Sequence, residues 1–433
     1  MTDGKLNIRR VTSAPQDLLE SRWPNRKTNR SKLYTHVEEI VRTIRKEGDS
    51  AVSRYTQEFD GTDLDGKFRI TGQEIEDAYN QVTKKQVAAI EIAISKLAAT
   101  SKRYLQRAEF SFKSDGIRAW NKVRPIRDVG CYVPGGLAAY PSSVVMAAVP
   151  ARVAGVKRVV ICTPPNEEGN INPLTLVAAD RCKVSEVYSV GGAQAIAALA
   201  YGTKSIKKVQ KIVGPGNKYV TLAKRIVSED VQIDLPAGPS ELLVLADNSA
   251  RPELIALDLI SQAEHDIDAS ILLVTSSKEI ANKVESQLQK RFSSIARAET
   301  IFESLQQNGL IYVCQSMEEG IAFANKYAPE HVQIMAKNAM GIAEKITSAG
   351  VVLIGDYSPV AASDYCLGTN HILPTGGFGN AFSGLSVNDF MRSFMVVESS
   401  RSGLKQVAPY IQTLSESEGL PNHGKAVEGR FIE

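Results

Sequence analysis

Apolar residues recur at helical spacing in the first hundred residues. Val37, Ile40 and Ile44 fall on one face, and Gly48 ends that run. Residues before about 30 are polar and contain two prolines, Pro15 and Pro24, so we expect an arm outside the core. The pattern therefore predicts helices over residues 31–47, 49–61 and 84–108.

Short apolar runs alternate with helical patterns from about residue 130 onward. Strands are predicted at 158–162, 186–190, 211–213, 242–245, 271–275, 311–314 and 351–354. The intervening helices are predicted at 173–179, 193–201, 218–227 and 252–265. This alternation is typical of parallel βαβ units. The fold class is therefore expected to be α/β, with two blocks, and the N-terminal helices are expected to pack on the second.

Composition excludes several classes of protein. The 433 residues include 51 basic and 48 acidic side chains, a balance that argues against a nucleic-acid-binding face. The most apolar stretch, residues 144–153, is interrupted by Pro150 and Arg152 and is too short to cross a bilayer. The first ten residues lack the apolar core of a secretory signal. Five scattered cysteines suggest a reducing compartment, so we expect a cytoplasmic protein.

Four of the five histidines lie late in the chain, each beside a carboxylate or an amide: His265, His331, His371 and His423. Gln262 and His265 are three apart on a predicted helix and face the same way. With Asp364 and His423 they would offer nitrogen and oxygen ligands to zinc or a similar ion. The alternative is that Gln262 and His265 only close the helix end through local hydrogen bonds.

Glu330 and His331 are an adjacent carboxylate and imidazole, two groups suited to general-base catalysis. The alternative is a structural histidine that opens a strand at 332–335. Adjacent residues of a strand face opposite sides. Both side chains can therefore reach one site only if the backbone is irregular there.

Three glycine clusters, at 135–136, 191–192 and 214–216, follow strand-like runs or turns. Glycine allows a backbone to approach a phosphate at the carboxyl ends of parallel strands. No complete Gly-x-Gly-x-x-Gly is present, because Tyr219 occupies the third glycine position after Gly214 and Gly216. These clusters indicate a nucleotide site without the usual dinucleotide fingerprint, and tight βα turns are the alternative for each.

Several longer segments, taken in order, resemble the histidinol dehydrogenase family over nearly the whole chain. They are Gly130-Cys-Tyr132-Val-Pro134-Gly-Gly136, Tyr140-Pro-Ser-Ser143, Gly191-Gly-Ala-Gln194, Val213-Gly-Pro-Gly-Asn217, Ala237-Gly-Pro-Ser240-Glu241, Ser261-Gln-Ala-Glu-His265, Ala328-Pro-Glu-His331, Gly368-Thr-Asn-His-Ile-Leu-Pro-Thr375 and Glu418-Gly-Leu420 with His423. The least similar part precedes residue 30.

The resemblance implies a zinc-dependent homodimer that oxidises L-histidinol to L-histidine through an aldehyde in two NAD-dependent steps, the last steps of histidine biosynthesis. It implies zinc ligands at Gln262, His265, Asp364 and His423, and proton acceptors at Glu330 and His331. Substrate contacts would be Ser240, Gln262, His265, His331, Asp364, His371, Glu418 and His423. The NAD site would include Tyr132, Gln194 and Asn217. Glu418 and His423 would reach the partner subunit's site.

The implied fold is a pair of incomplete Rossmann-like domains with parallel-rich sheets, an N-terminal helical arm and a small C-terminal tail domain. The expected boundaries are an arm over 1–30, a discontinuous domain over 31–129 and 240–385 that carries most of the zinc site, an inserted NAD domain over 130–239, and a helical tail over 386–433.

Three other functions would fit parts of this pattern. A related dehydrogenase could oxidise another polar alcohol on the same scaffold. A zinc hydrolase would instead use the metal to activate water directly. A binding module would show no turnover at all. NADH formation separates the dehydrogenases from the other two.

Overall fold

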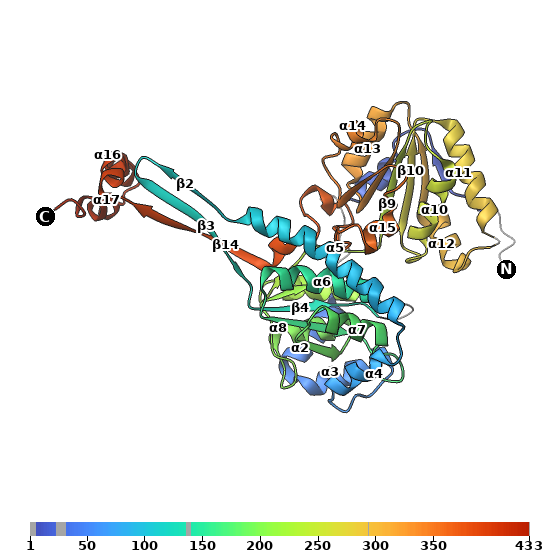
Figure 1. The fold of residues 1–433 in the computed structure, drawn as a ribbon, viewed down its shortest axis with the longest axis horizontal. Coiled ribbons are helices and arrows are strands. Elements are labelled where there is room, and N and C mark those ends of the chain that lie inside the picture. The colour runs from blue at the N-terminus through green and yellow to red at the C-terminus, as the bar shows by residue number, and fades with distance from the viewer. Residues whose placement is uncertain (1–5, 23–31, 136–139, 293, 433) are drawn as a thin grey trace.

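Two parallel β-sheets, each covered by helices, form the body of the molecule, and a long arm projects away from them (Figure 1). The structure is a computed structural model that describes residues 6–22, 32–135, 140–292 and 294–432. Gly136, one of the glycines discussed above, lies outside these ranges. Because strands and helices alternate in both sheets, the α/β prediction is confirmed.

The first sheet has five parallel strands in the order β6-β5-β4-β7-β8. Its strands are β4 Asp128–Tyr132, β5 Arg158–Thr163, β6 Glu186–Ser189, β7 Lys211–Val213 and β8 Gln232–Ile233. The helices between them are α6 Pro141–Ala154, α7 Pro173–Arg181, α8 Gly192–Tyr201 and α9 Lys218–Val227. Counted from β4, this order is 3-2-1-4-5, a Rossmann sheet that lacks its sixth strand.

The second sheet has the same order, counted from β9, with one strand added: β1-β11-β10-β9-β12-β13. Its strands are β1 Arg9–Val11, β9 Glu241–Ala246, β10 Ser270–Thr275, β11 Gly309–Val313, β12 His331–Met335 and β13 Val351–Ile354. Its helices are α10 Pro252–Ala263, α11 Lys278–Arg291, α12 Ala298–Asn308, α13 Met317–Tyr327, α14 Ala339–Ala343 and α15 Val360–Tyr365. All pairings are parallel.

The N-terminal helices pack on the first sheet, which corrects the expectation that residues 31–129 join residues 240–385. These helices are α2 Lys32–Glu47, α3 Asp49–Asp60, α4 Gly72–Tyr79 and α5 Lys84–Ala108. The apolar face of α2, including Ile40 and Ile44, shares a buried core with Val160 of β5 and Ile196 of α8. Periodicity predicted that α2 has an apolar face but not which sheet would cover it.

Residues 6–22 were expected to form an arm outside the core, but they pack on the second sheet. Strand β1 pairs with β11 and becomes the edge of the second sheet. Leu6 and Ile8 are buried in its core, and Leu19 of α1 Gln16–Glu20 is buried on the opposite face. These three buried apolar side chains hold the segment against the second sheet. Their spacing in the sequence is too irregular to predict that packing.

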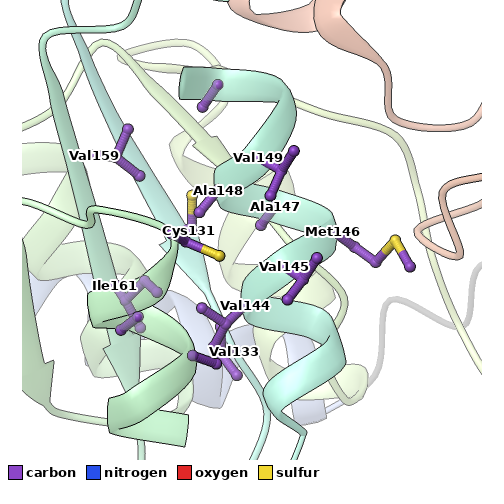
Figure 2. Packing of buried hydrophobic residues seen from close by; sticks show 14 of the residues in the cluster. Cys131, Val133, Val144, Val145, Met146, Ala147, Ala148, Val149, Val159 and Ile161 are labelled. Atoms are coloured by element: carbon purple, nitrogen blue, oxygen red, sulfur yellow. The ribbon is translucent and has the colours of Figure 1, made fainter. Parts of the chain in front are cut away.

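The apolar stretch at 144–153 lies in α6, where it packs on β4 and β5 (Figure 2). Val144, Val145 and Met146 are almost fully buried there, beside Cys131 and Ile161 of the sheet. Pro150 lies within the helix. None of the described helices combines the length and the apolar character needed to cross a lipid bilayer.

The projecting arm is a three-stranded antiparallel sheet in the order β14-β3-β2. It consists of β2 Phe110–Ser114, β3 Ile117–Pro125 and β14 Met391–Ser399, and it ends in α16 Arg401–Ser417 and α17 Pro421–Glu428. Short 3-10 turns at Phe378–Asn380 and Val387–Phe390 precede β14. The helical tail expected over 386–433 contains α16 and α17, but it begins with strand β14, which pairs along its whole length with β3.

Candidate functional site

Side chains that could carry chemistry gather at the amino ends of β9 and β12 in the second sheet. These strands are neighbours, with His331 opposite Leu242 in register. Helix α10 follows β9 and returns to the edge where that strand began, so Gln262 in its last turn reaches the same place. Ser240 directly precedes β9, and its carbonyl accepts a hydrogen bond from the Ser270 N–H at 2.9 Å.

Glu330 and His331 both face the start of β9, which resolves the geometric difficulty noted in the sequence. The strand begins only at His331, so Glu330 lies outside the regular pleat, two residues after a left-handed Ala328 (φ 49°). The Glu330 carboxylate lies 3.6 Å from His331 Nδ1. Both residues are almost fully buried. An acid and an imidazole are thus held together away from bulk water.

Burial and charge set the protonation of this pair. Burial disfavours a charged His331, but the carboxylates of Glu330 and Asp364 outweigh that effect and raise its pKa to about 10. Burial also raises the pKa of Glu330, although His331 opposes the shift. Both shifts favour keeping a proton at the pair, an arrangement suited to proton transfer.

Asp364, on α15, connects the pair to Gln262. Its carboxylate lies 3.6 Å from His331 Nε2 and 3.4 Å from Gln262 Nε2, and all three side chains are buried. Burial raises the pKa of Asp364, but His331, His371 and His265 together lower it on balance. His265 is solvent-exposed yet close enough to contribute to that shift.

These residues fit part of a metal site. Gln262, His265 and Asp364 supply amide oxygen, imidazole nitrogen and carboxylate oxygen, the donor types that suit zinc. His331 Nε2 is buried and makes no hydrogen bond within the described residues. No three His, Cys, Asp or Glu side chains in the described part of the chain are arranged to hold a metal ion. One chain therefore offers an incomplete set of donors.

His371 joins the two α/β units at this site. Its Nδ1 contacts the Asp364 carbonyl at 3.0 Å, and its Nε2 lies 3.3 Å from the Ser143 hydroxyl of α6. The neighbouring Asn370 side chain donates to the Met146 carbonyl at 2.8 Å. Burial lowers the pKa of His371, which favours the neutral ring. The site therefore lies between the second sheet and a helix of the first.

Glu418 and His423 do not join the other residues within one chain. Glu418 follows α16 and His423 lies on α17, at the far end of the arm, whereas α15 lies beside the second sheet (Figure 1). Both side chains are exposed.

The residues expected at the NAD site lie at the carboxyl ends of strands in the first sheet, whereas Glu330 and His331 lie at the amino ends of strands in the second. They are Tyr132, Gln194 and Asn217. Tyr132 ends β4 and accepts a hydrogen bond from the Gly192 N–H at 3.2 Å. Gln194 is fully buried on α8 and donates to Asp60 at 3.4 Å. Asn217 is exposed and caps α9 by accepting from the Tyr219 and Val220 N–H groups. Gly192 and Gly214 therefore lie against Tyr132, whereas Gly135 and Gly191 both lie against Pro164.

Sequence reasoning missed two contributors to the site, Ser143 and Glu241. Ser143 begins the buried part of α6, and Glu241 is the first residue of β9. Both lie inside segments that carried the family resemblance. The family resemblance could therefore have identified them. Their own positions could not, because neither lies beside a histidine in the sequence.

Comparisons with known proteins cover nearly the whole chain. A family model described as histidinol dehydrogenase matches residues 24–431. The chain is 42% identical over 426 residues to the histidinol dehydrogenase of Methanococcus maripaludis, covering 98% of this chain and 99% of the relative. It is 43% identical over 397 residues to that of Bacillus cereus, covering 92% of each. The crystal structure of histidinol dehydrogenase from Elizabethkingia anophelis superposes with a TM-score of 0.92 at 36% identity, covering 98% of both chains.

Proposed function

Since the chain belongs to the histidinol dehydrogenase family and is therefore an NAD-dependent oxidoreductase of histidine biosynthesis, we propose that it oxidises L-histidinol to L-histidine through histidinal. One observation carries this proposal. Glu330, His331 and Asp364 meet in a buried site between two Rossmann-like halves. A hydride acceptor bound on the first sheet could face an alcohol bound at the second.

Glu330 and His331 are the proposed proton acceptors. His331, in its neutral form, takes the alcohol proton as hydride leaves for NAD. Glu330 then takes a proton from the water that adds to the aldehyde, while His331 returns its proton to the aldehyde oxygen. His331 is then free to take the proton released when the hydrate is oxidised, and Glu330 passes its proton to solvent. The 3.6 Å separation of the two side chains allows a proton to pass between them after each step.

Zinc would be held by Gln262, His265 and Asp364 of one chain and by His423. When bound, it would supply a Lewis-acid anchor that orients the amino alcohol. Ser240 and His371 flank these donors and would contact the substrate. His331 and Glu418 would contact it as well. Burial favours the neutral His371 ring, whose Nδ1–H donates to the Asp364 carbonyl. Its Nε2 would therefore be the atom that accepts a hydrogen bond from a polar substrate group, in place of the Ser143 hydroxyl.

A homodimer with shared sites would complete this donor set. The arm exposes apolar side chains on both faces of its sheet: Phe110, Phe112, Met395 and Val397 on one face, and Phe394 and Val396 on the other. Exposed apolar surface of this kind is typical of an interface. Packed against a second copy, the arm would bring Glu418 and His423 to the partner's Asp364. The active site would then need both subunits.

NAD would bind along the carboxyl ends of the first sheet, where Tyr132, Gln194 and Asn217 lie. The amino end of α9, capped by Asn217, carries the positive end of the helix dipole, which suits the negative charge of the pyrophosphate. Gly214 has a φ of 117° and lies against the Tyr132 carbonyl, so glycine at this position allows the β7–α9 loop to pack directly on the end of β4.

Absorbance at the NADH wavelength tests the proposal directly. Purified enzyme with L-histidinol and NAD should form two NADH per substrate, and prior treatment with a chelator should abolish turnover and weaken substrate binding. Other polar amino alcohols and diols provide the comparison. Faster turnover of one of them than of histidinol, or none of histidinol, would overturn the substrate assignment. Unchanged histidinol binding after chelation would overturn the role of zinc.

A further inference from the structure

A buried ion pair joins the N-terminal segment to the first residue of β9. The Arg22 guanidinium donates two hydrogen bonds to the Glu241 carboxylate, each 2.6 Å long. Arg22 Nε also donates to the Tyr327 carbonyl at 2.9 Å, and the guanidinium lies 3.8 Å above the Tyr327 ring. The two charged side chains are only 8% and 6% exposed.

The backbone of the same Glu241 holds both proposed proton acceptors. Its N–H donates to Glu330 Oε2 at 2.9 Å. Its carbonyl lies 3.2 Å from His331 Nδ1. A carbonyl can only accept, so Nδ1 must carry a proton whether the ring is neutral or charged. One peptide position therefore orients the carboxylate and fixes which imidazole nitrogen is free to face Asp364.

The Glu241 side chain also reaches the segment that follows His371. Its Oε1 accepts from the Gly376 N–H at 2.9 Å. The carboxylate is thus anchored from two sides, by Arg22 and by Gly376. Because a bidentate Arg–carboxylate pair has a fixed planar geometry, it restrains Glu241 more tightly than a single hydrogen bond would.

We propose that Arg22 and Glu241 are positioning residues, which act through the Glu241 backbone to hold Glu330 and His331 in their working orientation. The inference rests on the proposed roles of Glu330 and His331. It gives the N-terminal segment a part in catalysis, although Arg22 precedes the residues that the family model matches. Neither residue touches the reacting atoms.

Three substitutions test the proposal by steady-state kinetics: Arg22→Met, Arg22→Lys and Glu241→Gln. Loss of the Arg22–Glu241 ion pair should lower kcat by roughly tenfold to a hundredfold, because misplacement of catalytic groups by about 1 Å has effects of that size. KM for histidinol should change much less. Arg22→Lys keeps the charge but not the two-point geometry, so it should recover only part of kcat. Arg9→Met, which breaks the exposed Arg9–Asp17 pair of the same segment, is the matched control and should keep full activity.

Imidazole ¹⁵N spectra give a readout that does not depend on turnover. The chain has only five histidines, and the His331 signals can be assigned by their loss in His331→Asn. In the wild type, His331 Nδ1 should resonate as a protonated nitrogen. In Glu241→Gln and Arg22→Met that resonance should shift and broaden, because the hydrogen bond from Nδ1 to the Glu241 carbonyl is no longer held in one geometry.

The outcomes separate this inference from the proposed function. If the wild-type protein does not turn over histidinol, the proposed histidinol dehydrogenase function is refuted. The nitrogen spectra would still test whether Arg22 and Glu241 position His331. Folded variants with wild-type kcat and unchanged His331 spectra would overturn the inference. If Arg22→Met fails to fold, Glu241→Gln and Arg22→Lys decide by the same two measurements.

Discussion

At the scale of single residues, burial decides what each carboxylate in this protein can do. Glu330 and Asp364 lie within 3.6 Å of the same imidazole, yet the pKa of Glu330 is raised and that of Asp364 is lowered. Burial raises the pKa of both, but three histidines surround Asp364 and outweigh it. Asp364 is thus suited to stay charged and Glu330 to exchange a proton, which supports their separate proposed roles.

Replacing Glu330 by Gln removes a proton acceptor while keeping the size of the side chain. We expect kcat to fall by about a hundredfold to ten-thousandfold, the usual contribution of a positioned general base. NADH formation should be followed separately from histidinol and from histidinal. Glu344→Gln, at an exposed position after α14, is the control. Full rates in both steps would show that Glu330 is not the base.

Asp258 offers a test of buried charge apart from the proposed catalytic groups. Burial raises its pKa to about 6, although Gln333 donates to it at 2.8 Å. A raised pKa means that its stabilising contribution is complete below the unfolded value near 4 and is lost as pH rises through about 6. Asp258→Asn removes that dependence.

We therefore expect the free energy of unfolding of the wild type to fall relative to Asp258→Asn by about 1 kcal/mol between pH 5 and 7.5. Urea denaturation of both proteins at the two pH values measures this difference. Asp268→Asn, at an exposed position, should show no such change. Parallel pH profiles for wild type and Asp258→Asn would contradict the assignment of a buried charge.

At the scale of elements, the two sheets share a strand order, but the proposed functional residues lie at opposite ends of their strands. The proposed NAD residues lie at the carboxyl ends of the first sheet, as Rossmann sheets lead one to expect. The proposed proton acceptors lie at the amino ends of β9 and β12 in the second. Helix α6 of the first sheet and the Asn370–His371 segment connect these edges through Ser143 and Met146.

The loop between β7 and α9 allows an element-level test. An ideal Cβ at Gly214 would lie 2.1 Å from the Tyr132 carbonyl oxygen, and the φ of 117° disfavours any other residue. We expect Gly214→Ala to lower the free energy of unfolding by about 2 kcal/mol or more and to raise KM for NAD. Thermal denaturation and NAD titration measure the two effects.

Gly72→Ala is the matched control for this loop. Gly72 begins α4, has no atom within 4 Å of its Cβ position and does not need a positive φ. Alanine favours a helix over glycine, so this change should be neutral or slightly stabilising. Equal effects of the two substitutions would contradict the close approach at Gly214.

At the scale of the whole molecule, the arm separates residues that the proposed chemistry needs together. Its three strands carry α16 and α17 away from both sheets (Figure 1). Gly116 at the β2–β3 turn packs directly against Gly403 of α16, so the end of the arm is a packed unit. A tail of this kind is well placed to enter another subunit.

Mixing two inactive variants tests the shared site. His331→Asn and His423→Asn should each be inactive as homodimers, because each site lacks one required residue. If sites are shared, a co-expressed heterodimer combines one intact site with one doubly defective site, and random pairing should restore about a quarter of the wild-type activity. Co-expression of His331→Asn with Glu330→Gln is the control, since both changes fall on the same side. Equal inactivity of the two mixtures would refute the shared site.

Sequence by itself determined the alternating elements and most of the chemistry-bearing residues. Strands at 211–213 and 351–354 and the helix at 218–227 have the predicted bounds, because apolar runs and glycine turns act locally. The Glu330–His331 pair was likewise visible as neighbouring residues.

Only the tertiary structure decided which of these elements meet. It placed helix α2 on the first sheet and joined Arg22 to Glu241 across 219 positions. It also separated α17, which carries His423, from α15, which carries Asp364 (Figure 1). Periodicity shows that a face must be buried but not by what, and a long-range ion pair leaves no local pattern. The edge strands β1 and β14 were missed for the same reason, since their pairing partners lie hundreds of residues away.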